Sequence, residues 1–281
     1  MRRMIKRIGF FVYGLVCYAI FFATFLYAIG FIGGFVVPTT LDGPARVPLA
    51  RGIAIDAALL GLFAVQHSVM ARRWFKERWT RIVPPVLERS TYVLLSSLAL
   101  ILVFWQWEPL GGVVWSVQNP MGRATLQALF GFGFLLVLLA TFLINHFDLF
   151  GLRQVWLYLR NKPYTKLHFG TPLFYRFVRH PLYVGWFFAF WATPTMTYAH
   201  LLFAIATTAY ILIAIQFEER DLVHEHGASY EAYRRQVPML IPFMRTTPAR
   251  TNLQKAGTAA LAFFLIKGLV WLGLGALALW W

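Results

Sequence analysis

Cysteine is almost missing from this sequence. Cys17 is the single cysteine among 281 residues, and it lies in an apolar run. One cysteine excludes an internal disulfide and any CxxC site, whether redox-active or metal-binding. His224 and His226 flank Glu225, but side chains two positions apart point in different directions on a helix. We therefore expect no metal site.

Charged residues are also scarce. They make up 13% of the chain, against roughly 25% in soluble domains, while 59% of residues are hydrophobic. Several apolar runs approach or exceed the ~18–20 residues that cross a bilayer. The sequence therefore predicts an all-α, polytopic integral membrane bundle of about five to seven segments. The expected segments are 8–37, 52–70, 90–107, 124–147, 182–193, 198–217 and 256–281.

We interpret the chain as one domain, 1–281. The N-terminal spans occupy 8–147, a region rich in candidate site residues runs from 145 to 242, and an extra span follows at 256–281. The stretch 182–217 is too long for one straight span and contains Pro194, so it predicts a helical hairpin that turns near Thr193–Tyr198.

The basic residues alternate along the chain. Four Lys or Arg lie in the N-terminal tail and six lie in each of the connections 71–89, 148–181 and 218–255, whereas the other connections hold only three. This is the positive-inside pattern. It predicts a cytoplasmic N-terminus and three cytoplasmic loops in the inner membrane. The net charge of +15 is then explained by topology and by contact with anionic lipids, not by binding to nucleic acid.

Four polar clusters each lie at the cytoplasmic end of a predicted helix. The clusters are QHS at 66–68, NHFD at 145–148, RH at 179–180 and EE at 218–219. A charged side chain in mid-span costs about 2.5–3.5 kcal/mol, so such groups tend to be functional. Four helix ends can converge on one pocket that is half in water and half in lipid. This predicts a water-soluble reactant that meets an apolar one.

The residue types in these clusters suit a zwitterionic ligand. An α-amino group is bound by carboxylates such as Glu218 or Glu219, and an α-carboxylate by Arg or a helix N-terminus. Pro181 is well placed as the first helical residue with His180 as its cap. A sulfonium would favour an aromatic face such as Tyr183. Spacing alone leaves the ligand open.

Three pieces of the C-terminal part carry a resemblance to a known superfamily. RHPLYVG is followed about thirty residues later by EERDL and then by GASYEAYRRQVPMLIP. Together they resemble the isoprenylcysteine carboxyl methyltransferase and phospholipid methyltransferase superfamily over residues 168–242. QHSVMARRWFKERWTRIVPPVLERSTYVLLSSLAL and NHFDLFGLRQVW extend the likeness to the NnrU-like branch and to membrane-bound methanethiol S-methyltransferases.

The resemblance implies S-adenosylmethionine as methyl donor and methanethiol, converted to dimethyl sulfide, as substrate. It assigns His180, Tyr183, Gly185 and Glu218 or Glu219 to the donor site. We add two candidates from the pattern of residues, Arg179 as a cationic donor and Tyr175 as a residue that lines the pocket. A Rossmann-type methyltransferase is excluded, because no GxGxxG motif follows a strand.

Methyl transfer to a thiol needs a base, or a positive charge that favours the thiolate. Cysteine has a pKa of about 8.5, and a simple alkyl thiol should be higher. His146, with Asp148 behind it, or His67 is the candidate proton acceptor. Arg153 is the candidate that stabilises the anion.

Each of these residues also has a purely structural interpretation. Arg179 and His180 can reach the lipid head groups, and His67 can form an interhelical hydrogen bond. His146 and Asp148 can be a polar helix end that pairs with Arg153. Glu219 can bridge to Arg220 or Arg234.

Other functions stay open at this point. A lipid or isoprenylcysteine methyltransferase would need a wide lateral opening for a tail. A reductase related to the sterol reductases would need NADPH. An NnrU-like non-catalytic protein or a transporter is the non-enzymatic alternative, although the lack of inverted repeats weakens the transporter.

Overall fold

The computed structural model describes residues 1–167 and 169–242. Its five long helices are α1 (Arg2–Gly33), α2 (Leu49–Ala71), α4 (Pro85–Gln106), α5 (Pro120–Ile144) and α9 (Tyr198–His226). Each is long and apolar enough to cross a membrane. The prediction of an all-α integral membrane bundle is confirmed. The expected span at 256–281 lies outside the described residues.

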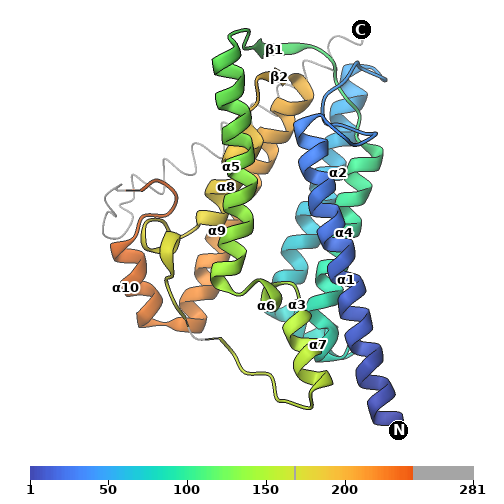
Figure 1. Ribbon diagram of the computed structural model, residues 1–281, viewed down its shortest axis with the longest axis vertical. Helices are drawn as coiled ribbons and strands as arrows, with labels where there is room; N and C mark the ends of the chain where they lie inside the picture. The colour runs from blue at the N-terminus through green and yellow to red at the C-terminus, as the bar shows by residue number, and fades with distance from the viewer. Residues whose placement is uncertain (168, 243–281) are drawn as a thin grey trace.

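The remaining elements are shorter, and most of them lie near the two ends of the bundle. They are α3 (Arg73–Trp79), β1 (Val113–Ser116), α6 (His146–Leu149), α7 (Leu152–Leu159), the 3₁₀ helix η1 (Leu173–Arg176), α8 (Pro181–Trp191), β2 (Thr195–Thr197) and α10 (Ala228–Gln236). Figure 1 shows α3, α6 and α7 at the same end as the N-terminus, and β1 and β2 at the other. We call the first the basic end, because the Lys- and Arg-rich tail lies there.

The predicted hairpin is present. α8 ends at Trp191, and α9 begins at Tyr198. The turn between them carries β2, which pairs antiparallel with β1 and aligns Val113 with Thr197. The turn predicted near Thr193–Tyr198 is confirmed. With 11 residues, α8 is too short to cross a bilayer alone, and α9 continues past the expected end at residue 217.

Two other helix ends differ from the expected positions because of left-handed residues. α1 ends at Gly33 rather than residue 37, since Gly34 has φ 73° and caps the helix. α5 ends at Ile144 rather than residue 147, since Asn145 has φ 97°. The Asn145 side chain accepts a hydrogen bond from the backbone N–H of Asp148. Residues His146–Leu149 therefore form a short helix of their own, α6, with Asn145 as its cap, and NHFD is not the last turn of the span.

The helices pack in two groups. α1 lies against α4 and α7, and α2 against α4, while α5 and α8 form the most extensive pair and α9 packs on α8. α2 also contacts α9 and so joins the groups. The α5–α8 pair is close because Gly133 faces Gly185: a Cβ built on Gly185 would lie 2.7 Å from the carbonyl oxygen of Gly133. Small residues commonly permit such approach between membrane helices.

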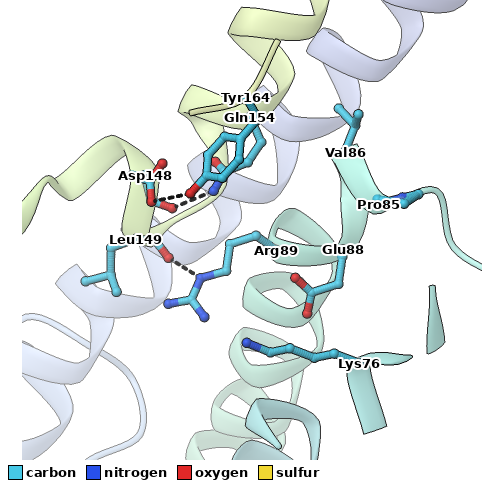
Figure 2. Close-up of a pocket in the computed structure, with 9 residues that line it drawn as sticks. All are labelled: Lys76, Pro85, Val86, Glu88, Arg89, Asp148, Leu149, Gln154 and Tyr164. Carbon is cyan, nitrogen blue, oxygen red and sulfur yellow. Dashed lines mark hydrogen bonds between the residues drawn. The ribbon is translucent and has the colours of Figure 1, made fainter. Parts of the chain in front are cut away.

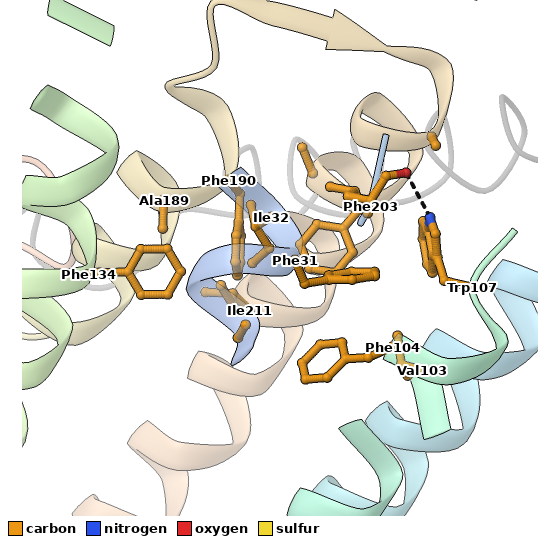
Figure 3. Close-up of a cluster of buried hydrophobic side chains, with 14 of the residues drawn as sticks. Phe31, Ile32, Val103, Phe104, Trp107, Phe134, Ala189, Phe190, Phe203 and Ile211 are labelled. Atoms are coloured by element: carbon orange, nitrogen blue, oxygen red, sulfur yellow. Dashed lines mark hydrogen bonds between the residues drawn. The ribbon is translucent and has the colours of Figure 1, made fainter. Parts of the chain in front are cut away.

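An aromatic cluster fills the half of the bundle away from the basic end. Phe31, Phe104, Trp107, Phe190 and Phe203 are buried together there (Figure 3). The ring N–H of Trp107 donates to the carbonyl of Leu41 at 3.0 Å. This cluster joins α1, α4, α8 and α9, and so it holds their other ends in place at the basic end.

A polar contact secures the hairpin turn in the same half. His200 is 1% exposed; its Nδ1 lies 3.3 Å from Oδ2 of Asp42, and its Nε2 lies 3.0 Å from the carbonyl oxygen of Phe190. Thr197 also donates to Asp42. The start of α9 is thus tied to the segment between α1 and α2.

Candidate active site

The RHP segment forms the start of α8 as the sequence predicts. Pro181 is the first helical residue and His180 occupies the cap position, but the His180 side chain makes no cap hydrogen bond. The backbone N–H groups of Arg179 and His180 donate to the carbonyls of Pro238 and Met239 at 2.9 and 3.2 Å. The tail that follows α10 therefore fixes the segment from the other side.

Glu219 is the buried partner of both cationic residues. Its Oε1 lies 2.6 Å from Nε of Arg179 and 3.1 Å from Nε2 of His180. Arg179 also donates to the carbonyls of Arg234 and Val237 at 3.1 and 2.6 Å. The side chains of Arg179 and Glu219 are 9% and 11% exposed. Their charges and hydrogen bonds are used within the protein, where they join α8, α9 and the tail after α10.

Glu218 differs from its neighbour in exposure. Its Oε2 accepts a hydrogen bond of 2.8 Å from the hydroxyl of Tyr183 and lies 3.9 Å from Nδ1 of His180, while 44% of its side chain is exposed. One turn of α9 thus holds a carboxylate committed to the fold, Glu219, and a carboxylate open to a ligand, Glu218.

Tyr175 lies close to the same carboxylate. Burial raises the pKa of the Tyr175 phenol above its ordinary value, and the charge of Glu218 adds to the effect. The phenol is therefore a neutral hydrogen-bond donor at physiological pH. The carbonyl of Tyr175 accepts a hydrogen bond from the hydroxyl of Tyr233 at 2.6 Å, which fixes η1 to α10. Gly185, by contrast, faces Gly133 of α5.

His67 lies in a network between α2 and α4. Its Nε2 is 2.9 Å from the hydroxyl of Tyr92, and its Nδ1 is 3.1 Å from Oγ of Ser96. Tyr92 and Ser96 are four residues apart and so share one face of α4. That spacing in STYVLLSS is a signal in the sequence that our site prediction missed.

This network approaches the α8–α9 carboxylate site. Ser68 and Tyr210 of α9 lie within hydrogen-bond distance, 3.1 Å between hydroxyls. Arg72, at the end of α2, pairs with Asp221 of α9 at 2.9 Å. The end of α2 that carries QHS is therefore tied to α9, the helix that carries Glu218 and Glu219.

His146 has a different environment. Its Nε2 is 2.8 Å from the hydroxyl of Tyr18, and its Nδ1 is 2.8 Å from Oγ1 of Thr141. Thr141 uses its own proton on the carbonyl of Leu138. Nδ1 of His146 must therefore donate, and Nε2 must accept from Tyr18. The residue is 2% exposed, and the phenyl ring of Phe142 stacks on it at 4.2 Å.

Asp148 is paired with Arg153 and makes no hydrogen bond to His146 in the described part of the chain. Oδ1 of Asp148 lies 2.9 Å from Nη1 of Arg153, and Oδ2 accepts from the hydroxyl of Tyr164 at 3.3 Å. Arg153 also donates to the carbonyl and hydroxyl of Thr165. This arrangement is the polar helix end that the sequence left open as the structural alternative.

A cavity of about 410 Å³ lies beside Asp148 at the basic end. Figure 2 shows side chains that enter it from α3, from the first turn of α4 and from α6 and α7. Its lining residues are Lys76, Pro85, Val86, Glu88, Arg89, Asp148, Leu149, Gln154 and Tyr164. Of the candidate site residues, only Asp148 is among them.

Comparison with known proteins places the chain in a family. It is 60% identical over 232 residues to a protein of Crocosphaera subtropica named methanethiol S-methyltransferase, and the match covers 83% of this chain and 91% of that protein. The methanethiol S-methyltransferase of Mycobacterium tuberculosis is 55% identical over 238 residues, which are 85% of this chain and 98% of that protein. The chain belongs to the methanethiol S-methyltransferase family.

Members of the methanethiol S-methyltransferase family are enzymes by name, and this chain is accordingly a methyltransferase. A more distant relative is Nurim of Xenopus laevis, 30% identical over 187 residues, which are 61% of this chain and 63% of Nurim. No protein-family model and no solved structure matches the chain at a significant level. The resemblance found in the sequence is confirmed.

Proposed function

We propose that this methyltransferase transfers a methyl group from S-adenosylmethionine to methanethiol and releases dimethyl sulfide, at the cytoplasmic face of the inner membrane. The observation that carries the proposal is the 60% identity to a methanethiol S-methyltransferase across most of both chains. The position of the polar clusters supports it, because His67, Glu218 and Tyr183 lie toward the basic end, where the basic tail predicts cytoplasm.

The donor site of the proposal is built around Glu218. A zwitterionic sulfonium needs a carboxylate for its ammonium group, and Glu218 has 44% of its side chain exposed beside Tyr183. The neutral phenol of Tyr175 supplies a hydrogen-bond donor there, and the tyrosine rings supply faces that attract a sulfonium. Arg179, His180 and Glu219 hold this site in shape. When bound, the donor supplies a methyl group that is already activated for displacement.

His67 is the better candidate for the base. The lone pair of His146 is used by the hydroxyl of Tyr18. His67 is instead held by Tyr92 and Ser96, whose hydroxyls can donate or accept as the imidazole changes its tautomer. Ser68, the neighbour of His67, lies within hydrogen-bond distance of Tyr210 on α9, the helix that carries Glu218. We therefore assign the thiol proton to His67, and the thiolate sulfur then displaces the donor's sulfur at the methyl carbon.

Gas chromatography of the headspace over cells that express the protein tests this function. Cells given methanethiol should release dimethyl sulfide, and purified protein should consume S-adenosylmethionine in the same proportion. A lipid or isoprenylcysteine methyltransferase would instead label those acceptors with methyl groups and give no dimethyl sulfide. That result would refute methanethiol as the substrate and would indicate a lipid or isoprenylcysteine acceptor instead.

Two histidine variants test the base. His67→Ala should lower kcat/KM at pH 7 by roughly 10²–10⁴, the usual contribution of general base catalysis. His146→Ala should reduce thermal stability and leave kcat/KM of the folded fraction close to wild type. If both variants keep the wild-type kcat/KM, the reaction uses no histidine base.

A further inference from the structure

The cavity beside Asp148 has features of a binding site separate from the donor site. At about 410 Å³ it falls in the range of small-ligand pockets, roughly 300–1,000 Å³. None of its lining residues belongs to the carboxylate site on α8 and α9. It lies at the basic end, next to the first turn of α4.

Two cationic side chains reach this cavity from different elements. Lys76 comes from α3 and Arg89 from α4 (Figure 2). Nε of Arg89 donates to the carbonyl of Leu149 at 2.6 Å, and its guanidinium lies 5.0 Å from the centre of the Tyr92 ring. Arg89 is thus held in position, and the N-terminus of α4 adds a partial positive charge nearby.

The charges around the cavity leave a positive excess. Asp148 is already compensated by Arg153 at 2.9 Å, so Glu88 is the one acid among the described lining residues that is left to oppose Lys76 and Arg89. Burial lowers the pKa of the Lys76 ammonium below its ordinary value, and Arg89 lowers it further. The ammonium is therefore costly in this place, and an anion between the two cations would reduce that cost.

The cavity also offers acceptors for a hydrogen-bond donor. The side-chain Oε1 of Gln154 is buried and has no hydrogen-bond partner among the described residues. Its Nε2 donates to the carbonyl of Asp148 at 3.1 Å, so the orientation of the amide is fixed. A buried acceptor without a partner costs about 1–3 kcal/mol. Glu88 supplies a carboxylate to the same space.

We propose that this cavity binds a phosphate ester that carries an amine, the chemistry of a phosphoethanolamine head group. The phosphate lies between Lys76 and Arg89, and the ammonium group donates to Glu88. The source is either a membrane phospholipid at the basic end or a soluble phosphate ester. Arg89 contacts Tyr92, which bonds His67, so the occupied cavity holds α4 beside the proposed base.

Binding of two probes to the full-length protein, delipidated in detergent, tests the proposal. The probes are a short-chain phosphatidylethanolamine, followed by native mass spectrometry, and O-phosphoethanolamine, followed by calorimetry. Binding of the lipid alone identifies the membrane as the source, and binding of both shows that the phosphate ester suffices. Failure of both probes to bind overturns the proposal.

Matched variants assign any binding to the cavity. Lys76→Gln should weaken binding roughly tenfold, by loss of a charge-assisted hydrogen bond. Arg73→Gln removes the same charge from the same helix, but Arg73 is 76% exposed and outside the cavity, so binding should be unchanged. Equal binding by the two variants overturns the proposal.

A second variant distinguishes binding of the amine from binding of the phosphate. It also keeps the proposal testable if Lys76→Gln fails to fold. Glu88→Gln should weaken binding of O-phosphoethanolamine and leave binding of inorganic phosphate unchanged or tighter, because only the amine uses the Glu88 carboxylate. Unchanged binding of O-phosphoethanolamine to this variant contradicts the placement of the amine. These binding readouts do not depend on which acceptor is methylated.

Discussion

Substitution of Gly185 tests whether this glycine is needed for helix packing or for binding of the methyl donor. In the Gly185→Ala variant the new methyl group would lie 2.7 Å from the carbonyl oxygen of Gly133 and 2.9 Å from the backbone nitrogen of Val137. Both atoms belong to the backbone of α5 and cannot move aside as a side chain would. Overpacking of this kind costs ~1–3 kcal/mol. Since each kcal/mol lowers Tm by roughly 2–4 °C in chains of similar size, we expect a loss of about 2–12 °C.

The control lies on the partner helix. A Cβ on Gly131 of α5 meets no atom within 4 Å. Gly131→Ala should therefore leave the free energy of unfolding unchanged or raise it by up to about 1 kcal/mol, because alanine has the higher helix propensity, and Tm should stay the same or rise slightly. Thermal unfolding of both variants in one detergent, read by static light scattering, compares them. If Gly185→Ala unfolds at the temperature of Gly131→Ala but loses affinity for the methyl donor, Gly185 contacts the donor and the packing argument is wrong.

Three further predictions concern the residues around Glu218. Tyr183→Phe should weaken S-adenosylmethionine binding in equilibrium dialysis roughly tenfold, since it removes the 2.8 Å bond that orients Glu218; unchanged affinity argues against Glu218 as the ligand. Arg179→Ala should destabilise the protein by about 3–5 kcal/mol, because it removes the guanidinium from the buried Glu219 and leaves this carboxylate with His180 alone among the partners described above; an unchanged Tm contradicts this. Burial raises the pKa of Tyr233 to about 12. Folding therefore favours its neutral form, and the resulting stability is complete below pH ~10 and lost as pH rises toward 12. The Tm difference between wild type and Tyr233→Phe should shrink over that range, and a constant difference refutes the assignment.

Several properties of the protein could be predicted from local patterns. The lengths of the apolar runs predicted the membrane helices, and Pro194 predicted the hairpin turn, because both depend on neighbouring residues only. Pro181 predicted the start of α8 for the same reason. The RHPLYVG and EERDL motifs predicted the family that the relatives then showed.

The partners of each polar side chain depended on the tertiary structure. Glu218 and Glu219 are adjacent in the sequence, yet only Glu219 meets Arg179, which lies forty residues earlier in the chain. His67 and His146 are both histidines toward the same end of the bundle, yet His67 meets two hydroxyls of α4, whereas His146 meets one hydroxyl of α1 and one of α5.

The difference between what the sequence predicted and what only the tertiary structure showed has a physical cause. Hydrophobic length and backbone preference are properties of a segment, so the sequence alone predicted the five long apolar helices and the short helix α8 that follows RH. Hydrogen bonds and ion pairs form between segments distant in the chain. The site around Glu218 therefore depends on the packing of α8 against α9. The cavity that Lys76 and Arg89 line depends on the packing of α3 and α4 against α6 and α7.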